Sequence, residues 1–389
     1  MPRLLAPEFT VVAESPDHRR HFTGSPCLIA DGSERLLCSW EWFQPSPFTE
    51  TIPNQLHIAA SEDDGRTWRV LSRQDMTWPS LFKVEDAVYL LGSRRMTREI
   101  VIQRSLDGGA SWTPESVLFE GRYHGAPTNI LFHNGHIYRA YETCPLDQPG
   151  GRGRSDWHSL VVAGNPSRDL LSPDSWRMSN HLPFPGVPDV LHGRRREPDY
   201  PRRVMEDCWI EGNIVCVDGE LRNILRTCID GYSTGSIAAV NRVHDTDTGL
   251  VCEFMQYSAM PGAQCKLQIV HDLPSNLFWT AANLQTRSWH DWNTFQVCTQ
   301  AGPPGNERRI LVLLYSLDAV NWLQAGVVAM SRRPLEAFSY ASILPHGLDL
   351  LILSRTSLGG INQHDTNLVT LHRVPRFREL ALDLTLDLT

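Results

Sequence analysis

The sequence predicts an all-β fold, a β-propeller built from four-stranded antiparallel blades. Two segments carry this prediction, Ser61–Trp68 and Ser105–Trp112, which both follow the pattern S-x-D-x-G-x-[ST]-W and begin 44 residues apart. We expect each to be a tight turn between strands, in which Asp accepts backbone N–H bonds, Gly supplies a positive φ and Trp packs beneath. Repetition at this interval is typical of a propeller, in which a blade with its loops takes about 40–60 residues.

The length of the chain sets the number of blades. At that repeat, 389 residues are enough for six or seven blades, and we expect seven, with six as the alternative. Weaker copies of the motif, Ser172–Trp176 and Ser316–Trp322, keep Ser, Asp and Trp but lose the Gly. These two segments are interpreted as decayed copies of the same turn.

Composition agrees with a mostly β protein. Hydrophobic residues make up 41% of the chain, and its 12 Trp, 26 Pro and 27 Gly suit short strands joined by many turns. Asn134-Gly135 and Asp218-Gly219 are expected hairpin turns. We expect one propeller domain over residues 1–389, with a loop-rich insertion around 145–203 that is rich in Gly, Pro and Arg.

Charge and targeting signals exclude several partners. The net charge of −8 argues against nucleic acid, because binding to the phosphate backbone needs a clustered cationic face. No apolar leader and no membrane-spanning run is visible, so we expect a cytoplasmic protein with no membrane partner. The nine scattered Cys lack C-x-x-C and H-x-x-x-H spacing, which predicts buried reduced thiols, no metal and no cofactor. The oligomeric state stays open.

The two turn motifs resemble the Asp-boxes, or BNR repeats, of sialidase-like β-propellers. Other segments narrow the resemblance to the rhamnosyl-glucuronate lyases, first described as α-L-rhamnosidases, and more distantly to the propeller ulvan lyases. The segments are Tyr123–Ile130, Phe132–Glu142, Trp209–Asn213, Leu221–Thr227, Trp279–Asn283 and His364–Asn367. The resemblance runs from about Gly24 to Arg378 and implies a carbohydrate-active enzyme.

Two departures bear on the activity that the resemblance implies. A sialidase would carry an Arg-Ile-Pro motif near its first strands, three Arg for the substrate carboxylate and a Tyr–Glu nucleophile pair, but this chain has no Arg-Ile-Pro. True sialidase activity is therefore not expected. The rhamnosyl-glucuronate group carries Ser-His-Asp with a catalytic His in its first blade, whereas this chain has Ser39-Trp40-Glu41.

The predicted reaction is β-elimination from a uronate in a rhamnose/glucuronate-type, anionic oligosaccharide. It needs a cation for the C6 carboxylate, a base for the C5 proton and an acid for the leaving oxygen, roles that suit Arg, His and Tyr. The predicted catalytic residues are His124, Arg226, Tyr123 and Glu41, and the predicted substrate-binding residues are Arg122, Arg355, His364, Trp40 and Tyr232. His124 leads because the Tyr-His-x-Ala-Pro run of ulvan-lyase-like propellers carries a catalytic His at the matching position.

Each candidate also has a structural interpretation. His124 could cap backbone groups in its Gly-Pro turn, and His364–Asn367 could be a turn that closes the last blade. Arg226 and Arg355 share a strand-end context that an internal repeat would also explain. Trp40 could be a core residue or a platform for a sugar ring.

Two other functions stay open at this point. An exo-glycoside hydrolase, sialidase-like or rhamnosidase-like, would need two carboxylates about 5 Å apart for retention or about 6.5–9.5 Å apart for inversion. Candidates for this pair are Glu41, Glu142, Asp207 and Glu211. The third possibility is a propeller that binds a glycan without cleaving it.

Overall fold

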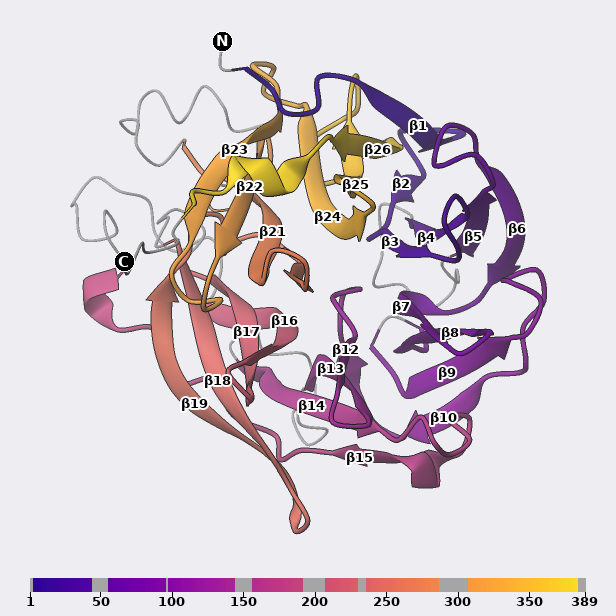
Figure 1. Ribbon diagram of the computed structural model, residues 1–389, viewed down its shortest axis with the longest axis vertical. Helices are drawn as coiled ribbons and strands as arrows, with labels where there is room; N and C mark the ends of the chain where they lie inside the picture. Colours follow the sequence, from indigo (N-terminus) through magenta and orange to yellow (C-terminus); the bar gives the residue numbers. More distant parts are fainter. Residues whose placement is uncertain are drawn as a thin grey trace, which may run out of the picture.

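The computed structural model describes residues 3–43, 55–95, 97–143, 156–191, 207–229, 236–286, 305 and 307–383. The described residues form six antiparallel sheets that stand as blades around a central axis (Figure 1). The predicted propeller is confirmed, but it has the alternative number of blades, six, and not the favoured seven. Between β15 (Trp176–Met178) and β16 (Cys208–Val217), the described residues 179–191 form no further blade strand.

In chain order, the first three blades start from the inner strands β2, β7 and β11. Blade 1 contains β2 (Phe22–Thr23), β3 (Cys27–Ala30), β4 (Leu36–Phe43), β5 (Gln55–Ser61) and β6 (Arg69–Gln74). Blade 2 contains β7 (Thr77–Val84), β8 (Ala87–Ser93), β9 (Ile100–Ser105) and β10 (Ser116–Phe119). Blade 3 contains β11 (Tyr123–His124), β12 (Leu131–His133), β13 (His136–Thr143), β14 (His158–Gly164) and β15, which the short 3-10 helix η2 (Pro173–Ser175) precedes.

The remaining blades start from β16, β20 and β24. Blade 4 contains β16, β17 (Glu220–Cys228), β18 (Ile237–Thr246) and β19 (Gly249–Ala259). Blade 5 contains β20 (Ile269–Asp272), β21 (Leu277–Asn283), β22 (Ile310–Ser316) and β23 (Leu323–Met330). Blade 6 contains β24 (Ala337–His346), β25 (Asp349–Ser357), β26 (Leu368–Val374) and β1 (Phe9–Glu14), and the 3-10 helix η7 (Phe377–Leu380) follows β26.

The N-terminal strand β1 closes the ring. It pairs antiparallel with β26 and becomes the outermost strand of blade 6. Figure 1 shows the indigo β1 beside the yellow β26. Both ends of the chain are therefore needed to complete the last blade.

The loop-rich insertion expected around 145–203 stays a prediction. Its described residues include β14 and β15, which are the two outer strands of blade 3. Residues 145–155 and 192–203 lie outside the described residues. None of the helices in the described part of the chain is long and apolar enough to cross a membrane.

The two motif turns have the predicted geometry. They join the third and fourth strands of blades 1 and 2, and in each the Asp carboxylate accepts a backbone N–H bond of 2.8 Å, from Thr67 to Asp63 and from Ser111 to Asp107. The Trp Nε1 donates to the carbonyl of the motif Gly at 3.1 Å in both. Because the third strand runs away from the site described below, these turns lie at the opposite end of the blades.

The two weaker copies differ from each other. In blade 5, Asp318 keeps the turn and accepts the N–H of Asn321 at 2.7 Å. In blade 3, Trp176 Nε1 donates to the carbonyl of Leu170 at 2.9 Å instead of to a carbonyl within the motif. The first segment is thus a variant of the turn, whereas the second has adopted another structure.

Apolar side chains fill the spaces between neighbouring blades. Ile58 of blade 1 and Leu90 of blade 2 share one buried cluster, and Tyr89 of blade 2 and Ile137 of blade 3 share the next. Between blades 5 and 6, Trp279 packs against Phe377 with ring centroids 4.9 Å apart. This packing holds the inner strands at fixed positions around the axis.

The inner strands of blades 2, 4 and 6 each contain a bulge at an equivalent position. The pairing of the first and second strands shifts between residues 77 and 80 in blade 2, 210 and 213 in blade 4, and 339 and 342 in blade 6. Each bulge contains a non-glycine residue with positive φ: Trp78 (50°), Glu211 (62°) and Tyr340 (53°). Such conformations cost about 1–3 kcal/mol each and concentrate at functional sites. The shared position places these three residues around the axis on alternate blades.

Candidate active site

The candidate site lies at the end of the axis where the inner strands begin and the second strands end. His124 of β11 pairs there with Glu142 near the end of β13. Arg226 and Arg355 occupy equivalent positions near the ends of β17 and β25, opposite Ile210 and Ser339. The shared sequence context of these two Arg therefore does reflect an internal repeat, and the repeat places both at one face.

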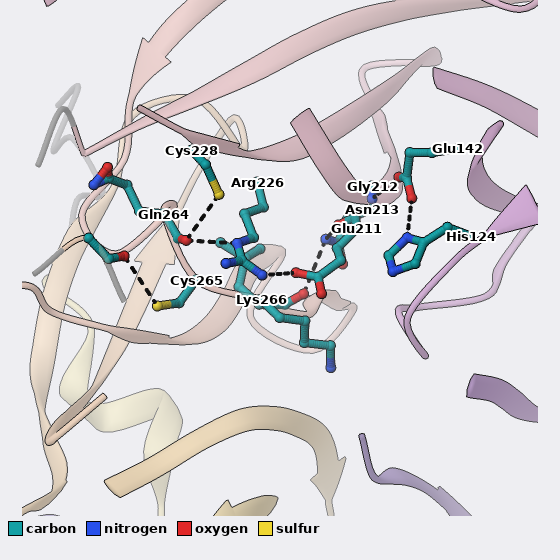
Figure 2. Close-up of polar contacts among 12 residues, drawn as sticks. His124, Glu142, Glu211, Gly212, Asn213, Arg226, Cys228, Gln264, Cys265 and Lys266 are labelled. Carbon is teal, nitrogen blue, oxygen red and sulfur yellow. Dashed lines mark hydrogen bonds and ion pairs between the residues drawn. The ribbon is translucent and has the colours of Figure 1, made fainter. Parts of the chain in front are cut away.

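A histidine–carboxylate pair forms the blade 3 side of the site. His124 Nδ1 lies 2.9 Å from Glu142 Oε2, and the N–H of Gly212 in blade 4 donates to Glu142 Oε1 at 3.4 Å (Figure 2). Burial raises the pKa of Glu142, and the hydrogen bond from His124 opposes this rise. Because Glu142 holds Nδ1 and the ring is 16% exposed, Nε2 is the nitrogen that can exchange a proton with a substrate.

Blade 4 contributes a buried ion pair. Arg226 Nη1 lies 2.7 Å from Glu211 Oε2, and Arg226 Nε donates to the carbonyl of Gln264 at 2.7 Å (Figure 2). Burial acts to raise the pKa of Glu211, but the positive charge of Arg226 outweighs it and the pKa lies below its ordinary value. Arg226 was predicted to bind the substrate carboxylate. Its pairing with Glu211 instead gives it the role of holding that residue ionised.

Blade 6 contributes a tyrosine surrounded by cations. The guanidinium carbon of Arg355 lies 4.4 Å from the centroid of the Tyr340 ring, and that of Arg308 lies 5.3 Å from it. Arg355 is buried, and its hydrogen bonds go to neutral atoms, the carbonyl of His364 (2.5 Å) and Oγ1 of Thr366 (3.4 Å). No carboxylate of the described residues forms an ion pair with Arg355. Its charge could therefore be compensated by an anionic ligand, and its role in substrate binding stays a prediction.

Lys266 and Arg139 are two buried cations that sequence reasoning missed. Lys266 Nζ donates to the carbonyl of Ala341 at 2.9 Å, and burial lowers its pKa to about 8. Arg139 donates to the carbonyls of Trp78 at 2.8 Å and Gly125 at 3.2 Å. The signal for Arg139 was a charged residue inside the apolar run of β13, Ile137–Tyr141. Arg308 and Tyr340 gave no comparable signal, whereas Glu211 was among the carboxylates named for a hydrolase.

Glu41 is buried in β4 of blade 1, and its catalytic role stays a prediction. Its Oε1 accepts the backbone N–H of Trp78, and its Oε2 has no hydrogen-bond partner in the described structure. A Cβ atom on Gly24 would lie 2.1 Å from that Oε2, so Gly24 covers the carboxyl group closely. Burial raises the pKa of Glu41 to about 7.

Tyr123 and Trp40 have packing roles in place of the predicted site roles. Tyr123 is buried in the cluster between blades 2 and 3, where its hydroxyl donates to the carbonyl of Glu120 at 3.1 Å. Trp40 is buried between blades 6 and 1 and stacks on His57 with ring centroids 5.4 Å apart. Both positions are filled by apolar neighbours, which leaves neither ring available to a sugar.

The other predicted binding residues are His364, Arg122 and Tyr232. His364 lies in the turn between β25 and β26, with its Nδ1 2.7 Å from Asp365 Oδ1, and its side chain is 48% exposed. Its ring contacts Tyr340 edge-on at 6.4 Å, so the turn lies at the mouth of the site. Arg122 directly precedes β11, and Tyr232 lies outside the described residues.

A cleft of about 750 Å³ lies elsewhere, between the turns of blades 3 and 4 at the opposite end of the axis. Its charged residues satisfy one another: Arg177 pairs with Asp245 at 2.5 Å, and Arg242 pairs with Glu220 at 2.7 Å. None of the predicted site residues lines this cleft. We therefore place the candidate site at the axial cluster. Among the described residues, no group of three or more His, Cys, Asp or Glu could hold a metal ion.

No protein-family model matches the chain, and no curated protein sequence matches it significantly. Among solved structures, Trypanosoma rangeli sialidase, as a covalent intermediate with 2,3-difluorosialic acid, gives a TM-score of 0.62 at 12% identity, over 97% of this chain and 60% of that chain. A Penicillium chrysogenum α-L-arabinanase complexed with arabinobiose gives 0.53 at 12% identity, over 95% of this chain and 99% of that one. The chain has a sialidase-type propeller fold.

A third solved structure agrees. The GH93 α-L-arabinofuranosidase of Fusarium graminearum with arabinobiose gives a TM-score of 0.54 at 12% identity, over 95% of this chain and 98% of that chain. At such low identity these likenesses show the fold alone. The narrower resemblance to the rhamnosyl-glucuronate and ulvan lyases stays a prediction.

Proposed function

We propose that this protein is a glycoside hydrolase that releases a terminal, carboxylate-bearing sugar, with Tyr340 as the nucleophile. The observation that carries the proposal is the position of Tyr340, which is held at positive φ on the axis beside Arg355 and Arg308. The fold likeness to a sialidase and to enzymes of arabinan cleavage supports a glycosidic bond as the target.

The chemistry follows from the charges around Tyr340. A tyrosine nucleophile, known from sialidases, suits an anionic sugar because a neutral hydroxyl is not repelled by the sugar carboxylate. Glu211 occupies the matching bulge position of blade 4, and its pairing with Arg226 keeps its pKa below the ordinary value, so it is the carboxylate proposed to accept the phenolic proton. Arg355 is proposed to bind the sugar carboxylate, and the absence of Arg-Ile-Pro favours an anionic sugar other than a sialoside.

The proposal is tested with a panel of neutral and carboxylate-bearing methylumbelliferyl glycosides. We expect release of the fluorophore from carboxylate-bearing sugars only, and we expect Tyr340→Phe to lower kcat/KM by about 10³-fold or more. Tyr89→Phe, which changes a buried tyrosine between blades 2 and 3, is the matched control. Full activity of Tyr340→Phe, or turnover of neutral sugars alone, would contradict the proposal.

The predicted β-elimination is the second candidate, and the His124–Glu142 pair favours it. In that reaction His124 Nε2 removes the C5 proton of a uronate whose carboxylate Arg355 neutralises. The product is then an unsaturated uronate that absorbs ultraviolet light, and no oxygen from labelled water enters it. If His124→Ala lowers the rate by about 10²–10⁴-fold while Tyr340→Phe stays active, the reaction is elimination and not hydrolysis. Binding of glycans without turnover of any substrate would leave the non-catalytic function.

A further inference from the structure

A partly exposed tryptophan interrupts an otherwise buried inner strand. In blade 2, residues 76–82 are buried except for Trp78, which is also the residue with φ of 50° in the bulge of β7. A large apolar ring gains most from complete burial, so packing does not explain why this ring stays partly exposed. Backbone strain at a partly exposed aromatic residue points to a ligand contact.

Buried side chains on both neighbouring blades hold Trp78 in this conformation. Its backbone N–H donates to Glu41 Oε1 of blade 1, and its carbonyl accepts a bond of 2.8 Å from Arg139 Nη2 of blade 3. Arg139 also donates to the carbonyls of Gly125 and Ala126, which fixes its guanidinium group. Two buried side chains from different blades thus hold the Trp78 peptide.

The Trp78 indole belongs to a row of three aromatic rings. His124 contacts Trp78 edge-on with centroids 4.8 Å apart, and on its other side it contacts Trp157 edge-on, also at 4.8 Å. All three side chains are partly exposed. Trp157 is anchored through its carbonyl, which accepts a bond of 3.0 Å from Trp209 Nε1. The row is therefore built from fixed residues of blades 2 and 3.

This aromatic row differs in character from the opposite side of the axis. The cations Arg355 and Arg308 gather at blade 6 around Tyr340, whereas the row offers two indoles and one imidazole. Indole faces suit the apolar C–H face of a pyranose, and His124 can bond its hydroxyls. We propose that Trp78 and Trp157 form a second subsite, which binds a neutral pyranose linked to the anionic sugar. This inference rests on the proposed function and specifies its substrate as an acidic sugar joined to a neutral one.

The test uses Trp78→Gly, because glycine adopts positive φ without strain and the fold should tolerate it. The probes are methyl glycosides of neutral hexoses and 6-deoxyhexoses, measured by saturation-transfer NMR and calorimetry without any cleavage. We expect the wild type to bind at least one of them and Trp78→Gly to bind it at least about tenfold more weakly, with Trp78→Phe between the two. Trp112→Phe, in an outer turn of blade 2, is the matched control and should bind like the wild type.

The outcomes separate this inference from the proposed function. Neutral pyranosides that bind through Trp78 to a protein with no hydrolase activity would support the subsite and overturn the proposed function. Hydrolysis of a methyl glycoside of the acidic sugar, with no binding of neutral pyranosides or with equal binding by Trp78→Gly, would overturn the subsite and leave the proposed function. Neutral pyranosides that displace an anionic ligand would also overturn it, because the two subsites must be filled together.

Discussion

Glu211 and Arg226 form a buried ion pair near the axis. Each is nearly inaccessible to solvent, and their contact of 2.7 Å compensates both. Removing one partner deprives the other buried charge of this contact, and breaking a buried ion pair in this way typically costs about 3–5 kcal/mol. We expect Glu211→Gln or Arg226→Met to lower the free energy of unfolding in urea by about that amount, and the double variant to recover much of it without recovering activity. Single variants as stable as the wild type would contradict this account of the pair.

Glu41 gives stability a specific dependence on pH. Its pKa is raised from 4.5 to about 7, so the folded protein keeps its proton at pH values where the unfolded chain has released it. This contribution to stability is fully present below pH 4.5 and is lost as the pH rises through about 7. As the pH is raised from 4.5 to 8, we expect the free energy of unfolding of Glu41→Gln, measured in urea, to rise by about 3 kcal/mol relative to that of the wild type. A constant difference across this range would show that Glu41 stays ionised.

The elements of the blades divide into those that sequence predicts and those that it does not. The bonds to the Asp carboxylates of the two motif turns, and those from Trp Nε1 to the carbonyl of the motif Gly, join residues of one short segment, which is why these turns were predicted from the sequence. The bulges at Trp78, Glu211 and Tyr340 depend on contacts with neighbouring blades, and none has the glycine that usually marks positive φ. This is why Tyr340 and Glu211 were not joined in one site from the sequence, whereas His124 and Arg355, which were named from the sequence, lie at the same end of the axis.

The motif turns support stability and lie away from the site. Hydrogen bonds from Thr67 and Ser111 lower the pKa of Asp63 and of Asp107, respectively, to about 2, which shows how strongly each turn uses its carboxylate. We expect Asp63→Ala and Asp107→Ala to lower the melting temperature by about 2–4 °C and to leave the activity per folded molecule unchanged. Calorimetry and initial rates check this prediction. A loss of activity without a change in melting temperature would place the turns in the functional site.

At the scale of the whole molecule, ring closure by β1 determines whether the propeller has an open edge. Without residues 1–14, β26 would become the exposed outer strand of blade 6, and such an edge pairs readily with other chains. We expect this truncation to aggregate or dimerise in light-scattering chromatography, and a synthetic peptide of residues 1–15 to reverse the effect. A monomeric, fully stable truncated chain would contradict the role of β1.

The propeller followed from the sequence because a repeated turn implies a repeated blade, whereas the count of blades did not. The spacing of the motifs predicts neither the 29 residues between β15 and β16 nor the place of β14 and β15 in blade 3. His124, Glu211 and Tyr340 belong to the inner strands of blades 3, 4 and 6, which only the closed ring brings around one axis. The site is therefore a property of the assembled ring.

The measurement that tests the central claim most directly is the mapping of a trapped glycosyl-enzyme. A panel of fluorinated glycosyl fluorides that carry a carboxylate is incubated with the protein, and the labelled peptide is sequenced by mass spectrometry. We predict a covalent adduct on Tyr340 that is absent from Tyr340→Phe. An adduct on a carboxylate such as Glu211, or turnover of a uronate to an unsaturated product with no adduct, would contradict the account.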